Sequence, residues 1–202
     1  MAMDTTAVQL VLASSSPRRA ELLREMGLRF EVCTPTVCEP EPRSPGQIPQ
    51  HWAEALSYFK ARSVAKDLRD GFVLGADTIV SLDDEIIGKP ADLDDARRIL
   101  NALVGTTHDV ITGVTLLNVE TGARLIRHET TAVTMKPMFK DTLERYLKSG
   151  MWEGKAGAYG IQDSSDANIE HLEGSYSNVV GLPIELVEQL CTDAGILDAV
   201  RA

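Results

Sequence analysis

The first quarter of the chain alternates apolar runs with polar turns in a way that predicts a strand, a helix and a second strand. Val8 to Ala13 form an apolar run of the length expected for a buried strand. The residues from Leu22 to Gly27 follow helical spacing and end on a glycine, and Leu28 to Val32 alternate as in a strand. Five prolines from Pro35 to Pro49 then predict a long loop.

The next segment predicts a helix followed by a buried strand. Trp52, Leu56 and Phe59 recur at helical spacing and form the expected apolar face of this helix. Lys60 is expected to extend along the edge of that face, with its charge in water. The run from Phe72 to Val80 predicts an apolar strand that carries a carboxylate, Asp77, in its middle.

The second half of the chain predicts hairpins mixed with helices. A hairpin over residues 81–90 leads to a helix that is opened by Asp92 or Asp94 and ended by Gly105. The remaining expected elements are antiparallel strands over Asp109–Val119 and Arg124–Met135, a helix over Asp141–Lys148, a glycine-rich stretch over 154–160, a strand over Ile169–Leu172 and a helix started by Pro183. This mixture predicts an α/β fold with a mixed, twisted sheet and flanking helices.

Composition limits the number of domains and the kind of partner. The 202 residues, 44% of them hydrophobic, suit a single domain over residues 1–202, and neither repeats nor linkers divide it. A formal net charge of −10 argues against a nucleic-acid-binding protein, which needs a surplus of lysine and arginine on one face. A small anionic substrate fits this charge only if a few basic residues converge locally.

Cysteine and hydropathy patterns indicate a reduced, cytoplasmic protein. The three cysteines form no C-x-x-C pair, and neither they nor the four scattered histidines have zinc-site spacing. The chain contains no run of about 20 apolar residues that could cross a membrane, and its start lacks the pattern of a signal peptide. We therefore expect no membrane association.

Ser14-Ser15-Ser16-Pro17-Arg18-Arg19 stands where the first strand turns into the first helix. A helix start presents unpaired backbone N–H groups and partial positive charge, so acidic residues are favoured there. Two arginines occupy this first turn instead, and neither Ser15 nor Ser16 has the partner of a capping box. The arrangement suits a bound polyphosphate, which would meet N–H groups, hydroxyls and guanidinium groups together. The alternative is a solvated helix start whose arginines pair with distant carboxylates.

Asp77 is a carboxylate within an apolar strand. Its desolvation is unfavourable unless a partner compensates it, and a metal ion or a catalytic water would do so. Open α/β sheets bind ligands beyond the carboxyl ends of their strands, where Asp77 lies if its strand ends or bulges there. The alternative is an edge strand that directs Asp77 to solvent.

Three further charged residues are candidates only in combination. Lys89 lies between Gly88 and Pro90, a restricted setting that could direct its ammonium to a phosphate. Lys60 could do the same, and Glu39 in the proline-rich loop could be a second oxygen ligand for Mg²⁺ or Mn²⁺. Each of the three also suits an ordinary solvated surface.

Several separate motifs in one order give the chain a specific resemblance. They are Ser14 to Arg19, Gly75 to Val80, Gly88-Lys89-Pro90, Thr107 to Val114, Lys155 to Gln162, and Gly174 to Pro183. Together they resemble the Maf family of nucleotide pyrophosphatases, from about Val8 to the final helix. The resemblance implies two lobes around a central cleft, a fold similar to the inosine triphosphate pyrophosphatases, and in many members a homodimer. It also implies hydrolysis of a nucleoside triphosphate to the monophosphate and pyrophosphate, with Mg²⁺ or Mn²⁺ as cofactor.

The resemblance assigns roles to single residues. It implies that Asp77 is the catalytic carboxylate and a metal ligand, with Glu39 as the second ligand. It implies a substrate-binding set of Ser16, Arg18, Arg19, Lys60 and Lys89. The branch that acts on dTTP and UTP is similar to this chain at Arg18, Thr78 and Gln162, which would set specificity. The alternatives are the branch that acts on 7-methyl-GTP, a broad-specificity pyrophosphatase, and a nucleotide-binding regulator of septum formation without catalysis.

Overall fold

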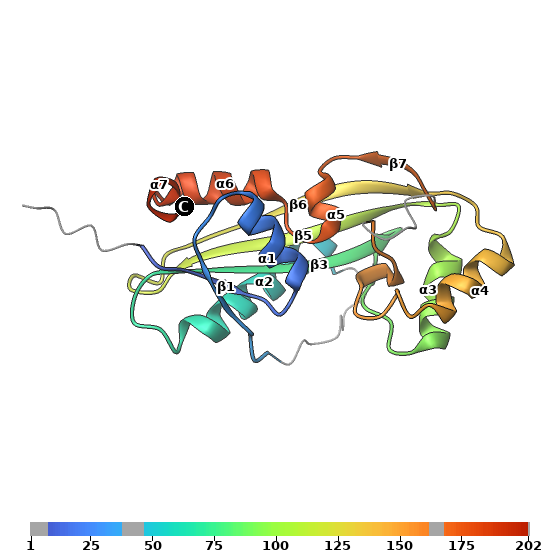
Figure 1. The fold of residues 1–202 in the computed structure, drawn as a ribbon, viewed down its shortest axis with the longest axis horizontal. Helices are drawn as coiled ribbons and strands as arrows, with labels where there is room; N and C mark the ends of the chain where they lie inside the picture. Colours follow the sequence, from blue (N-terminus) through green and yellow to red (C-terminus); the bar gives the residue numbers. More distant parts are fainter. Residues whose placement is uncertain (1–7, 38–46, 162–167, 202) are drawn as a thin grey trace, which may run out of the picture.

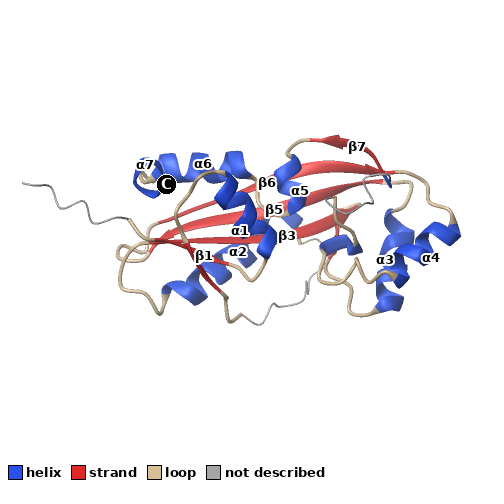
Figure 2. Ribbon diagram, viewed as in Figure 1, coloured by secondary structure: helices blue, strands red, loops and turns tan. Residues whose placement is uncertain are grey.

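The structure is a computed structural model that describes residues 8–37, 47–161 and 168–201 (Figures 1 and 2). Glu39 and Gln162 lie outside these residues. The strands are β1 (Leu10–Ala13), β2 (Glu31–Cys33), β3 (Phe72–Leu82), β4 (Glu85–Ile87), β5 (Thr107–Asn118), β6 (Arg124–Met135) and β7 (Ile169–Glu173). The helices are α1 (Pro17–Glu25), α2 (Pro49–Ala65), α3 (Leu93–Leu103), α4 (Lys140–Lys148), α5 (Tyr176–Val180), α6 (Ile184–Asp193) and α7 (Leu197–Val200), with a 3₁₀ turn η1 (Ala156–Ala158).

The strands form one mixed sheet in the order β2-β1-β3-β5-β6-β7. β1 runs parallel to β2 and to β3, whereas β3, β5, β6 and β7 pair antiparallel. β3 and β5 are long and stay in register from Phe72 opposite Asn118 to Ser81 opposite Asp109. The predicted α/β fold with a mixed sheet and flanking helices is confirmed.

Helices cover both faces of the sheet. α2 packs on one face, against β3 and β5, where alternate residues such as Val73 and Ile79 point. α1, α5 and α6 cover the other face around Leu10, Leu74 and Leu116 (Figure 1). None of the helices in the described part of the chain is long and apolar enough to cross a membrane.

The two largest groups of buried residues among the described residues correspond to the two predicted lobes. One group joins β1, α1 and α6, and the other joins α3, α4 and η1 to the far ends of β3, β5 and β6. Figure 2 shows α3 and α4 beyond one end of the sheet, well away from α6. Asp92 caps α3 by accepting a hydrogen bond from the backbone N–H of Asp95 at 2.8 Å, as the sequence predicts.

Some expected details differ from the structure. Pro49 does not belong to the loop but begins α2, because the first helical position needs no N–H donor. Phe59 does not belong to the buried face of α2: its exposed fraction is 43%. Lys60 lies on that buried face instead of at its edge, and it is 7% exposed. β2 is only a short, exposed strand, and Leu28 instead forms a single bridge with Arg201.

Two glycines let α2 lie directly on the sheet. A Cβ atom on Gly113 of β5 would collide with the backbone of Ala53, and one on Gly75 of β3 would collide with the carbonyl oxygen of Ser57. Neither glycine has a positive φ, so close approach of the helix is what these positions require. This approach brings the buried face of α2, including Lys60, onto the middle of β3.

We expect Gly113→Ala to destabilise the fold by about 3 kcal/mol or more, because the helix must move away from the sheet. Denaturant unfolding followed by circular dichroism measures this. Gly88→Ala is the control, since no atom lies within 4 Å of a Cβ built there, and its free energy of unfolding should stay close to that of the wild type. Equal stability of the two variants would contradict this packing.

Candidate active site

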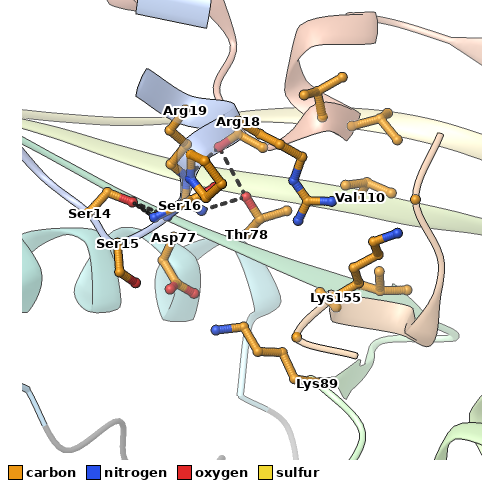
Figure 3. A pocket seen from close by; sticks show the side chains of 18 of the residues that line it. Ser14, Ser15, Ser16, Arg18, Arg19, Asp77, Thr78, Lys89, Val110 and Lys155 are labelled. Carbon is orange, nitrogen blue, oxygen red and sulfur yellow. Dashed lines mark hydrogen bonds between the residues drawn. The ribbon is translucent and has the colours of Figure 1, made fainter. Parts of the chain in front are cut away.

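A cavity of about 600 Å³ lies between the two lobes. The β1–α1 turn and the end of α5 form one wall, and the residues after β4 and around η1 form the opposite wall (Figure 3). Among the described residues, five basic side chains and two acidic ones line it: Arg18, Arg19, Lys60, Lys89 and Lys155, with Asp77 and Glu153. The local convergence of basic residues that the chain's negative charge requires is therefore present.

Lys60 and Asp77 form an ion pair at the floor of this cavity. The Nζ of Lys60 donates to Oδ1 of Asp77, and their side chains are 9% and 8% exposed. Each charge compensates the desolvation of the other, so removal of either one leaves a buried, unpaired charge. The sequence suggested a metal ion or a catalytic water as the group that compensates Asp77, and in the structure Lys60 compensates it.

Asp77 lies in the middle of β3, not at its end. The strand runs on to Leu82 without a break in its register with β5, so the strand neither ends nor bulges at Asp77. It is β1 that stops, at Ala13 opposite Gly75, while β4 pairs with β3 only from Val80 onward. Within the described residues, β3 has no strand partner on this edge from Ala76 to Ile79. The edge-strand alternative also fails, because β3 is central elsewhere and Asp77 is 5% exposed.

The start of α1 faces the gap that β1 leaves. Ser16 is its N-cap residue but makes no capping hydrogen bond with its side chain, and no acidic residue occupies the first turn. Instead Ser14 Oγ accepts from the backbone N–H of Ser16 at 3.1 Å. The predicted absence of a capping box is confirmed. Arg18 is half-buried, and its guanidinium group extends into the cavity (Figure 3).

Arg19 is buried and bound to the protein through all three of its nitrogens. Its Nε donates to the carbonyl oxygen of Gly181 at 2.7 Å. One terminal nitrogen donates to the carbonyl oxygen of Ala76 at 2.8 Å and to Ser14 Oγ at 3.4 Å, and the other donates to Thr78 Oγ1 at 3.0 Å. The adjacent arginines therefore differ: Arg18 reaches into the cavity, and Arg19 joins its walls.

Two lysines extend from the opposite wall. Lys89 and Lys155 both line the cavity, and in the view of Figure 3 the ammonium group of Lys89 points towards Asp77. The two wall segments are joined by a hydrogen bond of 3.1 Å from the N–H of Gly157 to the carbonyl oxygen of Gly88. Sequence reasoning singled out Lys89 but not Lys155, whose only signal was its position next to the glycine-rich segment.

One end of the cavity is apolar. It is lined by Val80, Val110, Tyr159, Ile161, Val179 and Val180. Tyr159 is fixed by a hydrogen bond of 2.6 Å between its hydroxyl group and Nε2 of His108, which lies behind it on β5. Burial lowers the pKa of His108 to about 4 and raises the pKa of Tyr159, so both side chains are neutral near pH 7. Sequence reasoning missed this pair because it joins residues that are distant along the chain.

A family model described as Maf-like protein matches residues 9–194. The chain belongs to the Maf-like protein family. It is 46% identical over 175 residues to a dTTP/UTP pyrophosphatase of Ruminiclostridium cellulolyticum, which covers 87% of this chain and 90% of that protein. It is 44% identical over 187 residues to a dTTP/UTP pyrophosphatase of Symbiobacterium thermophilum, with 93% and 94% covered. The predicted family is confirmed.

Two solved structures are similar at lower levels. A HAM1 protein from Coxiella burnetii is 20% identical with a TM-score of 0.41, covering 63% of this chain and 73% of that one. A nucleoside-triphosphatase / dITP/XTP pyrophosphatase from Mycobacterium abscessus is 14% identical with a TM-score of 0.45, covering 94% and 98%. At these values the likeness indicates nothing about substrate.

The acidic groups of this Maf-like cavity suit a divalent ion that arrives with its substrate. Among the described residues, no three His, Cys, Asp or Glu side chains are grouped closely enough to hold a metal ion. Mg²⁺ and its relatives are commonly held by one or two carboxylates together with substrate phosphates. Asp77 can supply one such carboxylate, and the predicted second ligand, Glu39, lies outside the described residues.

The burial of His108 predicts a pH-dependent stability. Between the pKa of about 4 in the folded protein and the ordinary value of 6.5, only the unfolded chain takes up a proton on this residue, so stability falls as pH falls. We therefore compare the fall in the free energy of unfolding from pH 7 to pH 5. We expect this fall to be about 2 kcal/mol smaller in His108→Gln than in the wild type. Urea unfolding at both pH values measures this. Identical losses in the two proteins would refute the assignment.

Proposed function

We propose that this Maf-like protein hydrolyses dTTP and UTP to the nucleoside monophosphate and pyrophosphate. The observation that carries the proposal is a cavity in which a buried acid, Asp77, is surrounded by basic side chains from distant parts of the chain. Relatives at 46% and 44% identity, aligned over most of their length, are named dTTP/UTP pyrophosphatases. The reaction needs an anion site of this kind beside a group that activates water.

The two ends of the cavity suit the two ends of a nucleotide. The triphosphate suits the end that holds Ser16, Arg18, Lys60 and Lys89, where it would meet the N–H groups of α1 and several cations. The pyrimidine ring suits the apolar end beside Tyr159. Arg18 extends between these ends, in keeping with its predicted roles in binding and specificity. Arg19 and Thr78 line the same cavity, and their predicted contacts with substrate stay predictions.

In the proposed reaction Asp77 acts as the general base. Its Oδ1 accepts from Lys60, and its second oxygen can accept a proton from a water that attacks the α phosphorus. The ion pair holds the carboxylate in one orientation before substrate binds. Attack forms a bond from the water oxygen to the α phosphorus and breaks the bond from that phosphorus to the bridging oxygen, which leaves with pyrophosphate.

Positive charge then stabilises the transition state. Arg18 and Lys89 point into the cavity, where negative charge grows on the phosphate oxygens and on the departing pyrophosphate. Removal of one such donor typically raises the barrier by about 3 kcal/mol. Asp77, with Glu39 as the predicted second ligand, would hold Mg²⁺ or Mn²⁺ against the phosphates, and the ion would supply Lewis-acid charge stabilisation. The homodimer and the cytoplasmic location also stay predictions.

A nucleotide panel tests the proposed function. Purified protein with Mg²⁺ or Mn²⁺ should release pyrophosphate from dTTP and UTP faster than from dCTP, dATP, GTP and 7-methyl-GTP. Equal rates for all triphosphates would remove the pyrimidine preference, and preference for 7-methyl-GTP would favour that branch of the family. Binding of dTTP without any release of pyrophosphate would favour the non-catalytic regulator.

Asp77→Asn is the matched variant for this panel. We expect turnover to fall about 10³-fold or more, because the amide cannot take up the proton of the attacking water. The fold should persist at reduced stability, because the buried Lys60 loses its counter-charge while the amide oxygen still accepts its hydrogen bond. Circular dichroism checks the fold, and full activity in a folded variant would exclude Asp77 as the base.

A further inference from the structure

Arg19 takes the place of a missing strand at the open edge of β3. Beyond Gly75 this edge has lost its pairing with β1, which leaves backbone carbonyl groups without a ladder partner. The guanidinium group of Arg19 donates to one of them, the carbonyl oxygen of Ala76, at 2.8 Å. A buried cation with a rigid array of donors thus closes the sheet edge where the cavity begins.

The contacts of Arg19 lie on both sides of Asp77 along β3. It binds the carbonyl oxygen of the residue before, Ala76, and the hydroxyl group of the residue after, Thr78. Successive side chains of a strand point to opposite faces, so Thr78 meets Arg19 on one face while Asp77 meets Lys60 on the other. Arg19 and Lys60 therefore hold this short stretch of β3 from its two sides.

The hydroxyl group of Thr78 is also used within the protein. Besides accepting from Arg19, it lies 2.8 Å from Thr112 Oγ1 and 3.3 Å from the carbonyl oxygen of Gly181. A threonine hydroxyl has one donor and two acceptor positions, so these partners use its capacity. Gly181 belongs to the turn after α5, and α5 is itself fixed by hydrogen bonds from Asn178 to Val110 and Thr131.

We propose that Arg19 is a positioning residue, not a ligand of the phosphates: it fixes the stretch of β3 that carries Asp77 relative to α1 and the turn after α5. The proposal rests on the proposed function, in which Asp77 activates water. It assigns different roles to two adjacent arginines: Arg18 contacts the substrate, and Arg19 contacts the protein. Thr78 takes part in the same positioning network.

The same substitution at the two arginines tests this assignment. The probe for binding is α,β-methylene UTP with Mg²⁺, which has no cleavable α–β bond, measured by calorimetry. Arg18→Gln should weaken its binding by about 10- to 100-fold, because a charge-assisted contact is lost. The dissociation constant of the analogue for Arg19→Gln should stay within about threefold of the wild-type value, at one site per chain. The kcat of this variant for UTP should fall by about 10- to 100-fold, because Asp77 is misplaced.

Stability without ligand provides a second readout. Arg19→Gln leaves buried carbonyl groups without donors, so its thermal midpoint should fall by about 4 to 8 °C. The midpoint of Arg18→Gln should stay near that of the wild type. If Arg19→Gln does not fold, Thr78→Val serves instead, because it removes the hydroxyl that Arg19 binds and keeps every cation. That variant should lose kcat and keep the affinity for the analogue.

Two results would overturn the proposal. The first is a loss of analogue binding in Arg19→Gln as large as in Arg18→Gln, with an unchanged thermal midpoint, which would make Arg19 a phosphate ligand. The second is wild-type kcat in Arg19→Gln or in Thr78→Val. Wild-type protein that binds the analogue but hydrolyses no triphosphate would contradict the proposed function alone. The analogue affinities and the thermal midpoints of the two arginine variants would still show whether Arg19 is a phosphate ligand.

Discussion

Lys60 and Asp77 can both be buried because they form an ion pair, in which each charge compensates the desolvation of the other. The pair requires α2 to lie directly on the sheet, which the glycines at positions 75 and 113 permit. It also requires a gap beside β3, because Asp77 can meet a substrate only where β1 has ended. The position of Asp77 therefore depends on both the early end of β1 and the close packing of α2.

The same gap explains why the cations gather there. An open sheet edge and the first turn of α1 both present backbone groups without a ladder or helix partner, and the cavity that they border is also lined by Arg18, Lys89 and Lys155. A protein with a formal net charge of −10 can hold a polyphosphate at this place because basic residues outnumber acidic ones among the described residues that line the cavity. Binding by so few cations should depend on salt less steeply than binding of a nucleic acid does.

Local sequence patterns predict the elements of this fold well, and tertiary contacts account for the differences. Apolar runs, Asp92 as a cap and the glycine after the first helix indicate most helices and strands. The buried face of α2 could not be predicted, because it contains Lys60. The burial of Lys60 depends on the carboxylate of Asp77, in a strand that follows α2 in the sequence. Motifs brought Arg18, Arg19, Asp77 and Lys89 together as candidates. Periodicity could not separate two adjacent arginines, because the partners of Arg19 on β3 and in the turn after α5 lie 57 to 162 residues away.

The fate of the water oxygen tests most directly whether water attacks the α phosphorus, as the proposed reaction at Asp77 requires. Hydrolysis of UTP in water enriched in ¹⁸O, followed by mass spectrometry of the products, shows which phosphorus was attacked. A buried base beside the α phosphate predicts one ¹⁸O in UMP and none in pyrophosphate. Label in pyrophosphate, or release of labelled inorganic phosphate, would contradict this account of the site.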